Sequence, residues 1–267
     1  MSNAIIGFGN QADAATFSGG SWVAAFPLAN LANRQIQKVA RSTNALAAST
    51  TFTAALAASS FIGALSLEGT NASVNATIRW RTYTDAGLTN LVYDSGVLTC
   101  YPNAPLQAEA NRFQRGLRHI PTLRNYAQYV LCEIVDTGNA AGYFQAGRLF
   151  VGDVLQPGTN MLYGASLQLK PFSTVTRSVN GAKYFTYRRP NLTFPIAFGA
   201  LTEVEAMIAL DLQAQVDITG EVLFIWDAAD FALQYRKSVF GELAQLDALQ
   251  YPNFANRAMA FQIEGVL

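Results

Sequence analysis

The stretch YVLCEIVDTGNAAGYFQAGRLFVG, residues 129–152, decides the fold of this chain. Two sets of side chains alternate along residues 129–135, with Tyr129, Leu131, Glu133 and Val135 in one set and Val130, Cys132 and Ile134 in the other, and two sets alternate again along residues 143–151. The run DTGN, residues 136–139, separates the two segments and consists of residues that favour turns. Period-two runs joined by turn residues are typical of antiparallel strands. The stretch therefore predicts a β-hairpin.

Shorter strand patterns precede this hairpin, and polar turns separate them. Several short strands at regular spacing favour a β-sandwich, which we expect over residues 31–155. The contributing segments are residues 51–56, 61–69, 76–83 and 91–96. Residues 1–30 are rich in small side chains and indicate an N-terminal arm that packs on a neighbour. The alternative is disorder, against which stand Ile5, Ile6, Phe8, Trp22, Val23 and Phe26.

A second β-rich domain is expected over residues 156–267. The turn cluster QPGTN at residues 156–160 marks the boundary. The dipeptide Asn180–Gly181 is the strongest hairpin signal in the chain. The predicted fold class is therefore mainly β, with a sandwich followed by a second β-rich domain that carries one helix.

That helix is expected near residues 201–216. Thr202 can cap its N-terminus, and Glu205 stands three residues on, as in a capping box. An apolar stripe at i, i+4 spacing predicts one buried face. The stripe consists of Val204, Ile208, Leu212 and Val216.

The composition limits the classes of partner. The 267 residues carry 18 Lys+Arg and 18 Asp+Glu, so the net charge is zero. General nucleic-acid binding needs a basic surface, and none is indicated. Charged residues make up 13% of the chain, which suits burial in a large assembly or life outside the cytosol. Two local basic clusters are interpreted as solvated or interface arginines rather than phosphate sites: Arg112/Arg115/Arg118/Arg124 and Arg177/Lys183/Arg188/Arg189.

The two cysteines and the N-terminus indicate where the chain is made. Cys132 alternates within an apolar strand, so a buried free thiol is expected, and the sequence leaves a bridge to Cys100 open. The N-terminus lacks the pattern of a signal peptide, and no apolar run predicts a transmembrane helix. We expect a chain that is made in a cytoplasm and stays soluble, or leaves it with a particle, and that does not insert into a membrane.

Residues for chemistry are scarce. His119 is the one histidine, so any Ser-His-Asp triad would have to include it, and an ordinary loop residue is the favoured interpretation. Nucleophile-elbow, zinc and phosphate-loop motifs do not occur. Asp85, Asn90 and Asp94 match no dedicated calcium loop. We therefore predict no catalytic, cofactor-binding or metal-binding residues and a protein that is not an enzyme.

The first domain resembles the galactose-binding-like (discoidin-type) jelly rolls. The resemblance rests on Arg41-Ser42-Thr43 before an apolar strand, on ATIRWR at residues 76–81, and on the closing hairpin at 129–152. Such domains bind sugars through exposed aromatic rings. The resemblance implies glycan contacts at residues near loops, namely Tyr83, Tyr93, Tyr101 and Tyr143. Cross-strand packing is the alternative role for these rings.

The second half is similar to the C-terminal part of phage tail-tip proteins. The matching residues are Arg177, Ser178, Gly181, Lys183, Tyr184, Arg188, Arg189, Leu192, Phe194, Leu201, Thr202, Glu205, Gly220, Val222, Leu223, Phe224 and Asp227. This resemblance implies a structural protein of a tail tip or baseplate, made in the host cytoplasm and carried in the virion. Its partners would be other tail proteins and further copies in a ring. Interface residues are expected at Arg188, Arg189, Trp22 and Phe26.

Two other functions remain open from the sequence. The first is a carbohydrate-binding module for host-surface glycan, which a tail protein can also carry. The second is a hydrolase, which would require that activity depend on His119.

Overall fold

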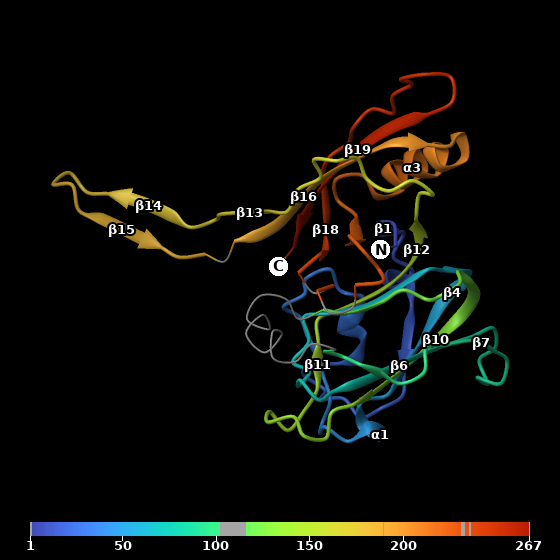
Figure 1. Ribbon diagram of the computed structural model, residues 1–267. Helices are drawn as coiled ribbons and strands as arrows, with labels where there is room; N and C mark the ends of the chain where they lie inside the picture. Colours follow the sequence, from blue (N-terminus) through green and yellow to red (C-terminus); the bar gives the residue numbers. More distant parts are fainter. Residues whose placement is uncertain (1, 102–115, 189, 231–232, 235, 267) are drawn as a thin grey trace. The chain divides into compact units, whose positions relative to one another are not determined.

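The computed structural model describes residues 2–101, 116–188, 190–230, 233–234 and 236–266 (Figure 1). The chain forms two compact units. We call Gly7–Val154 with Ala229–Arg236 the sandwich unit, and Met1–Ile6, Leu155–Ala228 and Lys237–Leu267 the C-terminal unit. The chain passes from the sandwich unit to the C-terminal unit between Val154 and Leu155. The domain boundary expected from the sequence lies one residue further on, between residues 155 and 156.

One layer of the sandwich unit is an antiparallel sheet in the order β2-β4-β10-β6-β7, with β8 pairing to β6. Buried and more exposed residues alternate along β6 and most of β10, as expected for a sheet with one face on a core. The strands are β2 (Thr16–Ser18), β4 (Phe52–Ile62), β6 (Thr77–Tyr83), β7 (Leu91–Asp94), β8 (Leu98–Thr99) and β10 (Asn125–Val135).

The facing layer contains β12 (Arg148–Leu155), β5 (Ala64–Glu68) and β9 (Leu117–His119). β5 lies between the other two strands and is antiparallel to both. The core between the layers contains Trp80, Phe52 and Phe144, each almost fully buried. The structure therefore confirms the predicted mainly-β fold with a sandwich.

Two short elements complete this unit at its loops. β3 (Ala40–Arg41) pairs with β11 (Gln145–Ala146), and α1 (Ala47–Thr50) is a single helical turn. The hairpin expected over 129–152 is thus formed differently, because β10 pairs with β4 and β6, and β12 pairs with β5 in the other layer. Residues 136–147 cross from one layer to the other.

Residues 1–30 are not an arm. β1 (Ile5–Phe8) is buried along its whole length, and η1 (Gln11–Ala14), β2 and η2 (Leu28–Ala32) follow it. β2 extends the first sheet by pairing with β4. Of the apolar residues that argued against disorder, Ile5, Ile6 and Phe8 lie in this buried strand, and Trp22 packs on Phe52 of the sandwich, so the segment is part of the protein's own fold, which corrects the expectation.

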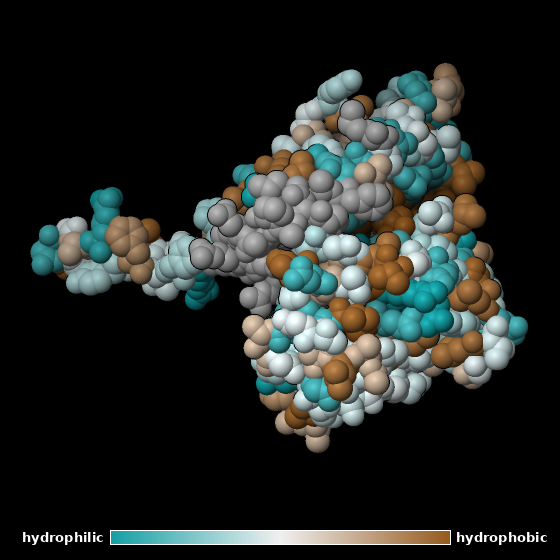
Figure 2. Space-filling model, turned by 60° about the horizontal axis from the view of Figure 1, so that its bottom comes forward, coloured by the Kyte–Doolittle hydropathy of each residue, from teal (hydrophilic) through white to brown (hydrophobic). Residues whose placement is uncertain are grey.

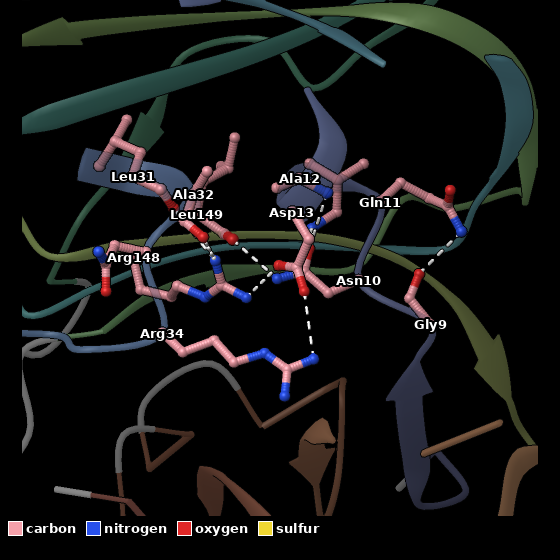
Figure 3. Close-up of polar contacts among 12 residues, drawn as sticks. Gly9, Asn10, Gln11, Ala12, Asp13, Leu31, Ala32, Arg34, Arg148 and Leu149 are labelled. Carbon is pink, nitrogen blue, oxygen red and sulfur yellow. Dashed lines mark hydrogen bonds and ion pairs between the residues drawn. The ribbon is translucent and has the colours of Figure 1, made fainter. Parts of the chain in front are cut away.

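A buried arginine fixes this N-terminal segment to the sandwich (Figure 3). The Arg148 side chain is 0% exposed and pairs through Nη2 with Asp13 of η1. Its Nη1 donates to the carbonyl oxygen of Ala32 at 2.5 Å. Arg34 pairs with the other Asp13 oxygen at 3.4 Å, and the Asn10 side chain exchanges hydrogen bonds with the backbone of β12. The contacts join η1 and η2 to one strand.

The C-terminal unit is built on a sheet in the order β13-β16-β19-β18-β17. α3 (Glu203–Val216) follows β16 directly and contacts β16 and β19. The strands are β13 (Gln168–Lys170), β16 (Asn191–Leu201), β17 (Glu221–Ile225), β18 (Ser238–Gln245) and β19 (Arg257–Gly265).

The predicted helix and capping box are confirmed, but the predicted buried face is half wrong. Thr202 accepts from the backbone N–H of Glu205, and the Glu205 carboxylate accepts from the N–H of Thr202. Leu212 and Val216 are buried as expected, whereas Val204 and Ile208 are exposed. Instead of Val204 and Ile208, the small side chains of Ala206 and Ala209 are buried on the side of the helix that faces the sheet. Their small size lets the helix lie close to the sheet.

The Asn180–Gly181 hairpin is confirmed. β14 (Thr174–Arg177) pairs with β15 (Lys183–Thr186) around a turn in which Gly181 has φ 84°. This positive φ favours glycine because it has no Cβ. The hairpin continues the β13–β16 edge outward, away from its sheet (Figure 1). We call residues 167–188 the projecting arm.

Both cysteines are free in the sandwich unit, which answers the question of a bridge. Cys132 is buried in the core, as predicted, and burial raises the pKa of its thiol. Burial also raises the pKa of Cys100 to about 12. Both thiols stay protonated at neutral pH, so they are packing groups rather than nucleophiles.

Candidate functional site

Two of the four tyrosines proposed for glycan contact are buried. Tyr83 and Tyr101 are each 4% exposed. The register of β6 against β7 shifts between Thr82 and Tyr83, so the alternation breaks and both residues turn inward. Tyr101 belongs to the core cluster. Neither ring offers a face on which a sugar could stack.

The other two tyrosines, Tyr93 and Tyr143, are half-exposed. Tyr143 belongs to a group that we call the Arg41 cluster, which consists of Phe26, Arg41, Tyr143 and Gln145. The Arg41 guanidinium lies between two rings, 4.5 Å from the Phe26 centroid and 4.3 Å from the Tyr143 centroid. Its Nη2 donates to Oε1 of Gln145 at 3.1 Å. All four residues are half-exposed. Cation–π contacts with the two rings and a hydrogen bond to the Gln145 amide thus hold the planar guanidinium of Arg41 in place at the surface.

The β3–β11 pair positions this cluster. Arg41 and Gln145 stand opposite each other in the register of the two strands. The Arg41 N–H donates to the carbonyl of Phe26 at 3.0 Å, which holds the Phe26 loop against β3. The expected interface residue Phe26 and the expected glycan residue Tyr143 therefore meet on one arginine, from segments more than a hundred positions apart in sequence.

A polar network holds the Tyr143 loop from behind. Asn71 donates to the carbonyl of Tyr143 at 3.0 Å and accepts from the N–H of Gln145 at 2.8 Å. Asn139 donates to the carbonyl of Asn71 at 3.0 Å and to the carboxylate of Asp136 at 2.7 Å. Asp136 is 3% exposed and fully hydrogen-bonded, so the loop is preorganised rather than adaptable.

The backbone of Trp22 pairs with the segment that carries Arg41. It forms a β-bridge with Ser42, the residue after Arg41. Its ring packs edge-on against Phe52 with centroids 6.0 Å apart, and its Nε1 donates to the carbonyl of Gly19 at 3.0 Å. Trp22 is therefore partly a core residue, and only its backbone bridge to Ser42 links it to the strand that carries Arg41.

The remaining residues singled out from the sequence lie elsewhere. Arg188 is exposed on the C-terminal unit, where its backbone bonds to the Ser173 hydroxyl. Arg189, Arg112 and Arg115 lie outside the described residues. Arg118 pairs with buried Glu68, and Arg124 pairs with Asp153 and covers the Phe61 ring at 4.0 Å. The described arginines of the first basic cluster are thus engaged within the protein.

His119 is bonded to Tyr93 rather than to a catalytic partner. The Tyr93 hydroxyl lies 2.7 Å from Nε2 of His119, and the two rings stack with centroids 5.9 Å apart. Burial lowers the pKa of His119 from 6.5 to about 4. The neutral imidazole is the form that this contact accommodates.

This histidine makes stability depend on pH. Between the folded pKa of about 4 and the unfolded value of 6.5, the unfolded chain binds a proton that the folded chain does not. The free energy of unfolding therefore falls as pH drops through that window, by about 1–2 kcal/mol after a discount for the half-exposed ring. We expect His119→Gln to remove this part of the pH dependence in urea titrations at pH 7 and pH 4.5. Identical pH dependence in the two proteins would contradict the assignment.

Two absences hold for the described part of the chain. Among those residues, no group of three or more His, Cys, Asp or Glu side chains is placed to hold a metal ion. No helix within the described ranges is long and apolar enough to cross a membrane.

Arg41 is the site residue that the sequence did not reveal as such. In the sequence it stands only as the first residue of the Arg41-Ser42-Thr43 segment. A position between two aromatic side chains would have pointed to Arg41. Phe26 and Tyr143, however, become its neighbours only when β3 pairs with β11. Long-range pairing of this kind is not encoded in local periodicity.

Comparisons with known proteins find only distant structural neighbours of the chain. No protein-family model matches the chain, and no curated protein matches it. Among solved structures, the family 32 carbohydrate-binding module of C. perfringens NanJ, in complex with galactose, has a TM-score of 0.41 and 12% identity. The match covers 55% of this chain and 99% of that one. The lectin domain of lectinolysin, complexed with Lewis B antigen, has a TM-score of 0.38 and 13% identity over 54% and 95% of the two chains.

A third structure is the CBM32 of AlyQ in complex with 4,5-unsaturated mannuronic acid, with a TM-score of 0.36 and 11% identity over 51% and 92% of the two chains. These three neighbours are carbohydrate-binding modules or lectin domains, whereas the mainly-β fold of this protein is established by its own sheets. The likenesses are too weak to carry an argument about a ligand. What the sandwich unit can bind is argued from its own residues.

Proposed function

We propose that the sandwich unit binds glycan at the Arg41 cluster. The observation that carries this proposal is the arginine held between two half-exposed rings beside an amide side chain. The apolar face of a sugar ring stacks on an aromatic ring, while guanidinium and amide groups bond to its hydroxyls. The cluster supplies all three groups, with Arg41 and Gln145 on the paired strands β3 and β11 and the two rings on the loops beside them.

The state of Arg41 supports a role beyond packing. Its Nε is buried and has no hydrogen-bond partner within the described residues, so the protein satisfies the guanidinium only in part. The rigid loop behind Tyr143 also lowers the entropy that a ligand must offset.

The first test is binding by the full chain to a printed array of neutral and acidic glycans, followed by calorimetry with the strongest hit. We expect Tyr143→Ala to raise the dissociation constant about tenfold, because one stacked ring contributes about 1–1.5 kcal/mol.

The matched control is Tyr251→Ala. Tyr251 also stacks on an arginine, with Arg257 4.4 Å from its centroid, but it lies on the C-terminal unit. Its removal should leave glycan binding unchanged. The proposal fails if no glycan on the array is retained, or if both variants bind like the native chain.

A second candidate function is a structural component of a phage tail tip or baseplate. Support comes from the resemblance of the second half to tail-tip proteins, from a charged fraction of 13%, and from the projecting arm. In this role the chain would join other tail proteins and further copies in a ring, support host attachment, and have no catalytic activity. Its place would be the virion tail, after synthesis in the host cytoplasm.

Immunogold electron microscopy with an antibody against residues 161–267 tests this second candidate. Label confined to the tail end of purified particles would support it. Absence of label on intact and on detergent-opened particles, with the chain free in the lysate, would leave glycan binding as the proposal.

A further inference from the structure

Charge is strongly segregated along residues 154–235. From Val154 to Pro190 every charged residue is a cation, namely Lys170, Arg177, Lys183, Arg188 and Arg189. From Asn191 to Tyr235 every charged residue is an acid, namely Glu203, Glu205, Asp211, Asp217, Glu221, Asp227 and Asp230. The first segment contains the projecting arm, and the second contains α3.

The projecting arm is both basic and apolar. Its large side chains are exposed, with Phe185 at 73% and Tyr187 at 77%. The others are Leu167, Leu169, Phe172, Val175, Val179 and Tyr184. Figure 2 shows hydrophobic and hydrophilic side chains next to one another along the arm. A two-stranded hairpin on its own has no second layer to cover such residues. Exposed apolar surface of this extent marks an interaction site.

The arm also carries an unfavourable cation pair. Arg177 and Lys183 are directly opposite each other in the β14–β15 register. Like charges in this position destabilise a strand pair. An acidic partner laid against the arm would turn this repulsion into attraction.

The outward face of α3 has the complementary chemistry. Val204 is 69% exposed, and Met207, Ile208 and Leu210 are also exposed. Asp211 is exposed on the same side of the helix as Val204 and Ile208. This side faces away from β16 and β19. Since apolar residues occur all round α3, the pattern is that of a helix covered on both sides. The described unit covers only one of them.

The arm cannot reach α3 of its own chain. The arm joins the sheet at the start of β16, whereas α3 begins after the end of that strand at Leu201. Eleven residues of strand separate these points by roughly 35 Å. The arm then extends further outward, and α3 lies at the other end of the unit (Figure 1). A contact between the two surfaces therefore requires two molecules.

We propose that the projecting arm of one copy docks on the outward face of α3 of a second copy. The contact is head-to-tail, so each chain donates one arm and accepts another, which generates a closed ring or a filament. It would serve the assembly role named above, but it stands independently of glycan binding by the sandwich unit. The apolar residues supply contact area, and the opposite charges set orientation and partner choice.

The test uses charge reversal in the full chain, with mass measured by light scattering and association by sedimentation velocity. Lys183→Glu keeps the arm folded, because the new carboxylate faces Arg177 across the strand pair. Asp211→Lys reverses the charge on α3 at an exposed position. We expect the native chain to form multiples of 28.8 kDa, and each variant to associate at least about tenfold more weakly.

An equimolar mixture of the two variants gives the decisive result. The Lys183→Glu chain retains a native α3, and the Asp211→Lys chain retains a native arm, so the mixture should associate more strongly than either variant alone. Lys38→Glu, at an exposed lysine of the sandwich unit, is the matched control and should behave like the native chain.

A monomeric native chain, unchanged association of Lys183→Glu, or failure of the mixture to associate would each overturn the proposal. None of these results bears on the Arg41 cluster, because glycan binding is measured separately and on the same variants. The two proposals can therefore fail independently.

Discussion

Replacement of Arg148 by Met is expected to lower the free energy of unfolding by about 3 kcal/mol. The substitution keeps an unbranched chain in a fully buried place but removes the partner of Asp13 and the donor to the carbonyl of Ala32. Breaking a buried ion pair from one side costs about 3–5 kcal/mol. The lower end of this range, about 3 kcal/mol, applies because the Asp13 side chain is 35% exposed and stays partly solvated.

Arg34→Met is the matched control, because Arg34 pairs with the same Asp13 but is 58% exposed. An exposed pair contributes about 0–1 kcal/mol, so this variant should unfold close to the native midpoint in urea. Equal destabilisation by the two variants would show that the N-terminal segment is held by something other than Arg148.

Glu68→Gln is the second large effect, with an expected loss of about 3 kcal/mol. Glu68 is 0% exposed and accepts from Arg118 at 2.7 and 2.9 Å and from the Ser66 hydroxyl at 2.5 Å. A carboxylate satisfies all of these donors, whereas an amide presents its own N–H₂ group to one of them. The Arg118 side chain is 6% exposed, so its charge would be left buried without a counter-ion.

Glu133→Gln offers the comparison at a surface pair. Glu133 pairs with Arg81 at 2.6 Å, with side chains 31% and 24% exposed. The expected loss is about 0.5 kcal/mol. Thermal unfolding of both variants at pH 7 measures the difference, and a Glu68→Gln protein as stable as Glu133→Gln would contradict the buried-pair argument.

Local chemistry was enough to predict several elements. The capping box at Thr202 and Glu205 and the turn at Asn180–Gly181 each depend on residues within a few positions of one another. Alternation along residues 76–83 and 129–135 indicated β6 and β10 for the same reason. These features survive in the structure because no long-range contact competes with them.

The site and the buried charges could not be predicted from local patterns. Arg41 gains its role only when residues 26 and 143 converge on it. Arg148 and Glu68 are charged residues inside strands, and sequence alone does not say that Asp13 and Arg118 will be there to pair with them. The inward turn of Tyr83 depends on an irregularity in strand register that no propensity predicts.

The path of the chain between the two units constrains the order in which the protein can be completed. Six N-terminal residues belong to the C-terminal unit, and eight residues from Ala229 to Arg236 belong to the sandwich unit. A ribosome adds about 5–20 residues per second, so Ser2 and Ala4 wait for partners that are made much later, Asp227 and Asn160. Neither unit is complete until most of the chain has been synthesised. A fragment cut at residue 154 would lack part of its own unit, whereas a circular permutant would keep every segment.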